Sequence, residues 1–299
     1  MKNIFLLGEN YLQDSLYNSP AKLKALLAER GLGMQKKFGQ NFLIDQNIRT
    51  KLISFLGLNE NDTVWEIGPG LGSMTELLLQ SKAKVKAFEI DTGFIKFLKE
   101  SFSSYNNFTL IEGDVLKNWQ NEAKVQVPKF FFGNLPYNIA ATLILDTVEH
   151  NVFFDTCVIT VQKEVADRFA SKVGGEDYSA TSILVQAFYD VKSILTISPR
   201  AFWPEPNVVS KAISLKRNST YTEALTGNEK MFFELTKALF FARRKTIKNN
   251  FQKWLKEKGY ETNLAEKIFS PELLARRAET LTIDETISIM QKVKEAIKS

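Results

Sequence analysis

The segment 134–137 reads Asn-Leu-Pro-Tyr and combines groups that could prepare an amine for reaction. The exocyclic amine of an adenine is a poor nucleophile because its lone pair is delocalised into the ring. The side-chain oxygen of Asn134 and the carbonyl of Leu135 could accept its hydrogens and draw the nitrogen toward a tetrahedral form. Pro136 restricts Leu135 to an extended conformation, which aims that carbonyl, and Tyr137 could stack on the base. Rate enhancement would come from positioning, without a general base.

A glycine-rich segment, Gly-Pro-Gly-Leu-Gly at 68–72, follows a strand-like run and precedes a helical one. Glycines at such a point let the backbone turn sharply and approach a ligand closely. The pattern differs from the G-x-G-x-x-G of dinucleotide enzymes, and an acidic residue, Glu66, precedes it. The segment is therefore a candidate for one side of a ligand pocket.

Two further carboxylates stand at the ends of the next two predicted strands. Glu89 could accept both hydroxyls of a ribose, and Asp114 could accept an adenine amino group. The carboxyl edge of an open α/β sheet is where such folds bind ligands, so these groups and the glycine turn predict a nucleoside pocket. S-adenosylmethionine is favoured over NAD, whose site uses the glycines on a pyrophosphate.

Each of these motifs has a purely structural interpretation when it is taken alone, and their order along the chain favours the functional one. Alone, Gly68–Gly72 could be a tight turn, and Glu89 and Asp114 could be helix N-caps. The segment 134–137 could likewise connect a strand to a helix that begins at its proline. Together, in this order, they favour an enzyme that methylates an amino group with S-adenosylmethionine.

The composition excludes several other classes of protein. A chain of 299 residues with 44% hydrophobic and 24% charged residues is typical of one large and one smaller globular domain. One histidine, His150, and one cysteine, Cys157, exclude a multi-histidine or cysteine-rich metal site and an internal disulfide. We therefore expect no metal and a reducing, cytoplasmic compartment. We also expect no membrane span or signal peptide, since no apolar run is long enough.

The basic residues are unevenly distributed. Residues 1–216 contain 23 basic and 23 acidic residues, whereas residues 217–299 contain 16 and 11 and carry the whole net charge of +5. A neutral body with a basic C-terminal part favours a polyanionic partner, although a solvated lysine-rich surface would have the same composition.

Strand-like and helical runs alternate through the first 217 residues, about 25 residues per unit. This alternation predicts an α/β fold with βαβ units and a mostly parallel sheet. The segment 178–197 begins helical and becomes strand-like. The other predicted strands are 63–67, 84–90, 108–112, 129–132, 156–161 and 211–215, and the helices are 19–30, 47–56, 73–79, 93–99 and 140–149.

After Arg217 the pattern becomes entirely helical. A polar, turn-rich segment, 218–228, is predicted to be a linker. The pattern predicts a helical domain at 218–299. The C-terminal helices are predicted at 231–241, 246–258, 261–269, 271–277 and 283–297.

A basic cluster, Arg243, Arg244, Lys245 and Lys248, is predicted to open one of these C-terminal helices. On a helix, residues 244 and 248 would share a face. Such a cluster would bind RNA phosphates and set orientation without reading sequence. An interdomain cluster of salt bridges is the alternative.

Six segments together resemble the ribosomal RNA adenine N6-dimethyltransferases of the small subunit, the KsgA type. The resemblance implies a Rossmann-like class I methyltransferase domain with a mostly parallel seven-stranded sheet and a small all-helical C-terminal domain. It also implies that the helical domain at 218–299 binds RNA, that a methyltransferase domain spans 35–217, and that residues 1–34 form an N-terminal helical extension. The resemblance runs from about residue 35 to the C-terminus, and the first 30 or so residues are expected to be a lineage-specific extension. The segments are 37–43, 66–72, 133–138, 162–164, 202–210 and 243–246.

The resemblance also implies roles for individual residues. It places Phe202 near the target base, opposite Tyr137, and a bulky Trp203 departs from the family pattern. The implied activity is dimethylation of two adjacent adenines in the 3′-terminal hairpin of 16S rRNA, late in assembly of the small subunit, by a monomer. Cofactor contacts are expected at Asn41, Leu43, Gly68, Glu89, Asp114 and Asn134.

Two other functions fit parts of the sequence. A large-subunit adenine methyltransferase of the macrolide-resistance type shares the pocket and the aromatic turn, but the C-terminal domain and the F-x-P-x-P segment at 202–206 favour the small-subunit enzyme. A non-catalytic RNA-binding assembly factor on the same fold is the second. The intact Gly68, Glu89, Asp114 and Asn134 argue against lost catalysis.

Overall fold

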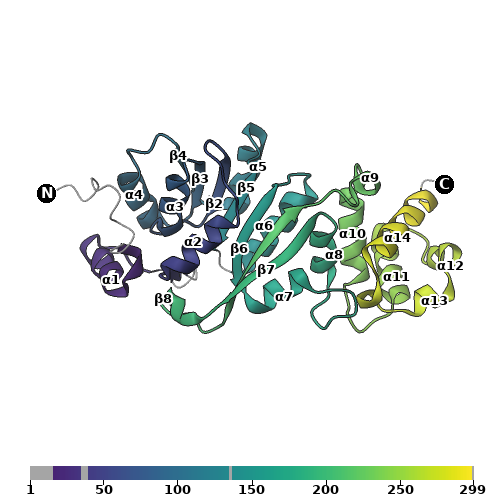
Figure 1. Cartoon of the computed structure of the whole chain (residues 1–299). Helices are drawn as coiled ribbons and strands as arrows, with labels where there is room; N and C mark the ends of the chain where they lie inside the picture. Colours follow the sequence, from purple (N-terminus) through teal and green to yellow (C-terminus); the bar gives the residue numbers. More distant parts are fainter. Residues whose placement is uncertain (1–15, 35–39, 135–136, 298–299) are drawn as a thin grey trace. The chain divides into compact units, whose positions relative to one another are not determined.

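The computed structural model describes residues 16–34, 40–134 and 137–297, without the side chains of Tyr137 and Asn138 (Figure 1). The chain folds into two compact units. Unit 1 comprises Met1–Ala140, Phe154–Lys163 and Lys192–Lys216; unit 2 comprises Ala141–Phe153, Glu164–Val191 and Arg217–Ser299. This division differs from the proposed domain boundaries at 34 and 217, which remain predictions.

A seven-stranded sheet runs through the first 217 residues in the order β4-β3-β2-β5-β6-β9-β7. Neighbours from β4 to β6 are parallel, and β9 pairs with β6 in the antiparallel direction. The predicted mostly parallel sheet is confirmed. The strands are β2 (Thr63–Ile67), β3 (Lys84–Glu89), β4 (Phe108–Glu112), β5 (Phe130–Asn134), β6 (Thr156–Gln162), β7 (Tyr189–Ile197) and β9 (Ser210–Arg217).

The central strands are continuous apolar runs because helices cover both faces of a parallel sheet. Phe131 and Phe132 of β5 are fully buried, and so is Cys157 on β6. Leu43, Val64 and Phe132 belong to one large apolar cluster of unit 1. This packing holds the strand ends in fixed relative positions.

Helices α4 and α5 begin at aspartates whose side chains accept backbone hydrogen bonds of the first turn: Asp91 and Asp114. The sequence did not predict α5 and α7, each of which buries two side chains. These helices are α2 (Gln46–Ser54), α3 (Ser73–Gln80), α4 (Thr92–Ser101), α5 (Val115–Val125), α6 (Tyr137–Glu149), α7 (Lys163–Ala170) and α8 (Ala180–Gln186).

The N-terminal segment forms a short 3-10 turn, Leu16–Asn18, and helix α1 (Pro20–Glu29). Ser19 caps α1 and a proline occupies its first turn, so the predicted helix is confirmed. A separate two-stranded sheet pairs β1 (Phe42–Leu43) with β8 (Phe202–Trp203), just after the 3-10 turn Pro199–Ala201. No local sequence pattern predicts this pairing.

The chain after Arg217 is helical, as predicted, and α10 packs against α8, α11 and α14 (Figure 1). The expected linker contains a short helix, α9 (Thr222–Leu225), whose Leu225 is buried. The remaining helices are α10 (Glu229–Leu239), α11 (Ile247–Lys258), α12 (Leu264–Ile268), α13 (Pro271–Ala275), the 3-10 turn Ala278–Thr280 and α14 (Ile283–Ala296). No helix of the described segments is long and apolar enough to cross a membrane.

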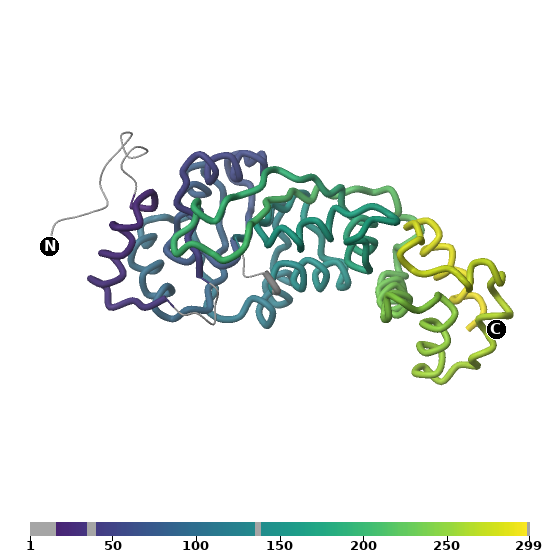
Figure 2. The backbone as a smooth tube through the Cα atoms, turned by 90° about the horizontal axis from the view of Figure 1, so that it is seen from below, coloured from purple at the N-terminus to yellow at the C-terminus, as the bar shows by residue number. Residues whose placement is uncertain are grey.

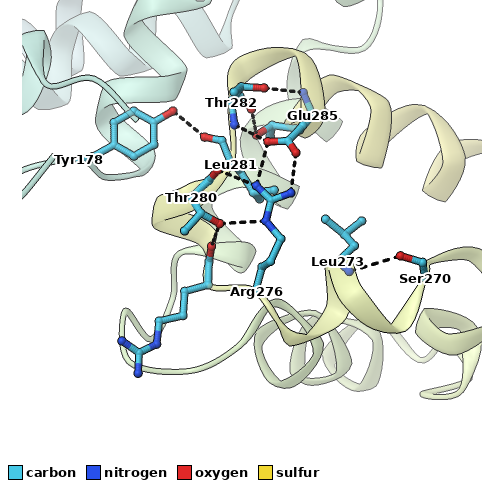
Figure 3. Close-up of polar contacts among 10 residues, drawn as sticks. Tyr178, Ser270, Leu273, Arg276, Thr280, Leu281, Thr282 and Glu285 are labelled. Atoms are coloured by element: carbon cyan, nitrogen blue, oxygen red, sulfur yellow. Dashed lines mark hydrogen bonds and ion pairs between the residues drawn. The ribbon is translucent and has the colours of Figure 1, made fainter. Parts of the chain in front are cut away.

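Hydrogen bonds and an ion pair hold the start of α14 in unit 2 (Figure 3). Thr282 and Glu285 form a reciprocal capping box, and Arg276 pairs with the Glu285 carboxylate at 2.6 and 3.1 Å. The Arg276 guanidinium lowers the pKa of Glu285. The Tyr178 hydroxyl donates to the Leu281 carbonyl at 2.8 Å, which ties the segment before α8 to α14.

Candidate active site

A cavity of about 320 Å³ lies in unit 1, at the carboxyl ends of β2, β3, β4 and β5. This volume is within the usual range for small-molecule sites. Apolar side chains, including Phe42, Met74, Phe88 and Phe94, line much of it. All six residues expected to contact a cofactor line it together: Asn41, Leu43, Gly68, Glu89, Asp114 and Asn134.

The glycine turn forms one wall of this cavity. Gly68, Gly70 and Gly72 have φ values of 67°, 59° and 88°, in the left-handed region that side chains disfavour. A Cβ at Gly70 would lie 3.1 Å from the Phe42 ring, and one at Gly72 would lie 2.5 Å from the Phe102 ring. Glycine is therefore required at 70 and 72 both for backbone conformation and for space.

Glu89 fastens the glycine turn to the end of β3. Its Oε2 accepts a hydrogen bond from the Gly70 amide, and its Oε1 accepts from the Ile90 and Asp91 amides, all at 2.9 Å. The residue is only 5% exposed, and this burial raises the pKa of Glu89 although the three amides oppose the shift. The carboxylate thus shapes the wall of the cavity as well as lining it.

Glu66, on β2, is a second buried carboxyl group at the cavity, where the sequence predicted it as the acidic residue before the glycine turn without assigning it a contact. It is 1% exposed and accepts a hydrogen bond of 2.7 Å from the Thr75 hydroxyl. Burial, with a smaller contribution from the charge of Glu89, raises the pKa of Glu66 to about 8. The sequence marked Glu66 as part of the pocket, but its burial and its bond to Thr75 are visible only in the structure.

Asp114 combines the two roles that the sequence left as alternatives. It is the N-cap of α5, with Oδ1 accepting from the Leu116 amide at 3.0 Å, and it also lines the cavity. A carboxylate has lone pairs for more than one donor, so capping leaves capacity for a ligand.

Asn134 is the last residue of β5 and lines the cavity. Its Nδ2 donates to the Asn41 carbonyl across 3.5 Å, which is long for a hydrogen bond. None of the described residues donates to its side-chain oxygen. Leu135 and Pro136 lie outside the described residues, and of Tyr137 only the backbone, at the start of α6, is described.

Phe202 is not brought to the cavity. Its backbone pairs with Leu43, and its side chain is 5% exposed within the main apolar cluster of unit 1. The neighbouring Trp203 ring stacks on Phe42, with a centroid separation of 6.3 Å. The expected contact between Phe202 and the target base therefore stays a prediction.

The basic cluster differs from its prediction in one respect. Residues 243–245 form a turn, and α11 begins only at Ile247, after Thr246, whose hydroxyl accepts from the Asn249 amide. The statement that residues 244 and 248 share a helical face is therefore wrong. Thr246 has an extended backbone and caps the helix there, so α11 cannot include the preceding residues.

Two of the four basic residues are engaged within unit 2. Arg243 pairs with Glu279 at 3.1 Å and also donates to the Glu176 carbonyl, and Lys248 pairs with Glu266 at 2.9 Å. Arg244 and Lys245 are exposed. The turn therefore presents two cations to solvent and uses a third in local structure.

The chain matches the family model described as "Ribosomal RNA adenine dimethylase" over residues 31–293. The chain belongs to this family. Among curated relatives, "Ribosomal RNA small subunit methyltransferase A" of Treponema denticola is 52% identical over 253 residues, which cover 84% of this chain and 86% of the relative. The adenine dimethylase therefore methylates adenine in ribosomal RNA, and S-adenosylmethionine is its cofactor.

Solved structures agree with the fold of this adenine dimethylase. A dimethyladenosine transferase from Plasmodium falciparum has a TM-score of 0.70 at 24% identity, covering 84% of this chain and 97% of that one. The 23S rRNA methyltransferase ErmE has a TM-score of 0.58 at 19% identity, covering 84% and 99%. At these identities the likeness concerns the fold alone.

The residues of the cavity fit the cofactor of the adenine dimethylase. Gly70 keeps the backbone open where a side chain would collide with Phe42, and Glu89 and Asp114 supply the acceptors that hydroxyl and amino groups of a nucleoside require. Apolar walls surround these acceptors. Such a combination of few polar groups in an apolar cavity is typical of a small-molecule site.

Proposed function

We propose that this enzyme dimethylates N6 of two adjacent adenines in the 3′-terminal hairpin of 16S rRNA, late in assembly of the small subunit. It acts as a monomer in the cytoplasm. The observation that carries the proposal is the single cavity at the strand ends that gathers Glu89, Asp114 and Asn134. The small-subunit activity named for the T. denticola relative supports the small subunit as the substrate.

Glu89 and Asp114 orient the cofactor in this proposal. Glu89, held by three amides, accepts the ribose hydroxyls, and Asp114 accepts the adenine amino group while it caps α5. Asn41, Leu43 and Gly68 complete the contacts around the cavity. S-adenosylmethionine would supply there a methyl group bonded to a positively charged sulfur; as an amine nitrogen bonds to the methyl carbon, the carbon–sulfur bond would break and S-adenosylhomocysteine would leave.

Asn134 acts on the target amine. Its side-chain oxygen accepts one hydrogen of the adenine amino group, and the Leu135 carbonyl accepts the other. The long contact of Nδ2 with the Asn41 carbonyl orients the amide so that the oxygen is available at the cavity. The nitrogen then attacks with its lone pair, and its proton leaves to water after the transfer, so positioning rather than a shifted pKa drives the step. Base contacts by Tyr137 and Phe202 are part of the proposal; the Tyr137 side chain lies outside the described residues, and the Phe202 side chain lies in the apolar cluster of unit 1.

The turn 243–245 and Lys248 bind rRNA phosphates. Arg244 and Lys245 are exposed, and Arg243 and Lys248 add charge beside them. Phe241, two residues earlier, is 66% exposed, and Lys253 lies 3.2 Å from its ring centroid. An exposed ring among cations is suited to an unpaired base of RNA.

Methyl incorporation tests the substrate. Small subunits that lack the modification should accept about four methyl groups in the 3′-terminal hairpin, two on each adenine, and large-subunit rRNA should accept none. Methylation of large-subunit RNA would favour the macrolide-resistance activity. RNA binding without transfer to either subunit would favour an assembly factor.

A further inference from the structure

Residues 16–34, which lie mostly before the family match, pack against the part of unit 1 that carries the cavity (Figure 2). Tyr17, Leu23 and Leu27 share one apolar cluster with Leu71 of the glycine turn. Phe42 and Phe94 belong to the same cluster and also line the cavity. One layer of side chains therefore has the N-terminal segment on one side and the cavity on the other.

The N-terminal segment also contacts α4 at two further points, Leu32 and Arg30. Leu32 lies so near the first turn of α4 that a Cβ at Gly93 would be 2.8 Å from it. At the exposed edge, Arg30 pairs with Glu100 at 2.7 Å. The segment is thus packed against this unit rather than loosely attached.

Tyr17 reaches the glycine turn directly. Its hydroxyl donates a buried hydrogen bond of 2.9 Å to the carbonyl of Leu71, between Gly70 and Gly72. Burial raises the pKa of Tyr17, so the hydroxyl keeps its proton at physiological pH. The Gly72 amide donates to the Pro69 carbonyl and the Gly70 amide to Glu89. The Tyr17 bond adds a restraint at Leu71, between the two left-handed glycines.

Arg49 restrains a second carbonyl beside the same turn. It is 1% exposed, and its Nη1 donates to the carbonyl of Ser73, the first residue of α3, at 3.2 Å. Its other terminal nitrogen donates to Asn18, and its guanidinium lies 5.7 Å from the centre of the Tyr17 ring. The N-terminal segment and α2 thus hold the carbonyls of the two residues that flank Gly72.

We propose that residues 16–34 form the outer support of the cofactor cavity and that Tyr17 is a positioning residue for S-adenosylmethionine. Tyr17 acts through the glycine turn, which it holds in the conformation that receives the cofactor. The proposal rests on the proposed cofactor role of the cavity. Residues 16–34 would then affect cofactor binding as well as the stability of the fold.

Tyr17→Phe is the decisive variant because it keeps the ring in the apolar cluster and removes only the hydroxyl. The Kd for S-adenosylhomocysteine, measured by calorimetry well below the melting temperature, should rise roughly five- to tenfold, the effect of about one neutral hydrogen bond. KM for S-adenosylmethionine should rise in parallel, with kcat within about twofold of wild type. Amide hydrogen exchange at residues 68–73 should accelerate in the absence of cofactor.

Arg30→Ala is the matched control, since it breaks an exposed contact of the same segment that does not touch the turn. Its Kd should stay within about twofold of wild type. If Tyr17→Phe lowered the melting temperature but left Kd, KM and exchange unchanged, the segment would only stabilise the fold and the proposal would fail. Failure of the wild type to bind S-adenosylhomocysteine would instead overturn the cavity's proposed function.

Discussion

The cavity of unit 1 and the basic turn of unit 2 hold their functional groups in different ways. At the cavity, Glu89 is buried and fixed by three backbone amides, and Glu66 is buried against Thr75. At the turn, Arg244 and Lys245 extend into solvent on long side chains. The first site holds its carboxylates by hydrogen bonds within the protein, whereas the second presents its charges on exposed side chains.

This difference predicts how each site responds to change. Groups that are preorganised in a low-dielectric cavity contribute through geometry, and salt screens them little. Exposed cations contribute through long-range attraction to phosphates, and salt screens them strongly. Substitutions at the cavity should therefore give large effects that are insensitive to salt, and those at the turn should give small effects that depend on salt.

The largest effect is expected for Asn134→Ala. Removing an acceptor that tightens only as the amine becomes tetrahedral should lower the methyl-transfer rate about a hundredfold or more, with little change in RNA affinity. Single-turnover methylation at saturating cofactor and RNA measures this rate, and cofactor affinity is measured alongside because Asn134 lines the cavity. A rate near that of the wild type would assign the positioning of the base to Pro136 and Tyr137 instead.

Glu89→Ala should weaken S-adenosylhomocysteine binding by about 1.5–3 kcal/mol, roughly ten- to a hundredfold, because it removes charge-assisted hydrogen bonds. The matched control is Glu112→Ala. Glu112 ends the neighbouring strand in register with Glu89 but pairs with Lys99 and does not line the cavity. Calorimetry should show weaker S-adenosylhomocysteine binding for Glu89→Ala and unchanged binding for Glu112→Ala. Equal affinities in the two folded variants would contradict the role of Glu89 as a cofactor contact.

Arg244→Ala and Lys245→Ala should each reduce the slope of log K against log salt for RNA binding by about one, with several-fold weaker binding at moderate salt. Phe241→Ala should weaken binding without altering the slope, since stacking releases no counterions. Filter binding across a salt series separates the two behaviours. If both cation variants kept the wild-type salt slope, the turn would not contact RNA phosphates and would have only a structural role in unit 2.

The smallest expected effect concerns stability and pH. Burial raises the pKa of Glu66 to about 8 from an ordinary value of 4.5, so the folded state retains a proton that the unfolded state loses. The stability that this proton contributes is complete below pH 4.5 and is lost as pH rises through 8. Glu66→Gln should therefore gain several degrees in melting temperature relative to wild type between pH 6 and pH 9.

Thermal melts across this pH range check the Glu66 prediction. Glu112→Gln, a change at an exposed carboxylate, should show a difference from wild type that is nearly independent of pH. A flat difference for Glu66→Gln as well would mean that the carboxyl group is ionised in the folded protein.

Much of the fold followed from local patterns. The strands 63–67 and 108–112 have the predicted bounds, because a short apolar run between turn residues is a local signal. Helices α5 and α7 were not predicted, although each buries an aromatic side chain, Trp119 and Phe169. The pairing of β1 with β8 joins residues about 160 positions apart, and two-residue strands carry no periodicity of their own.

The sequence by itself determined which groups meet at the cavity. Parallel strands end at one edge, so a glycine turn and carboxylates at successive strand ends must converge there whatever the details of packing. Only the tertiary structure decided that Glu66 is buried, that Phe202 lies in the core, that Thr246 ends the turn before α11, and that Tyr17 reaches the Leu71 carbonyl. These outcomes depend on which surfaces distant in sequence come together, and that is set by packing of the whole core rather than by any local pattern.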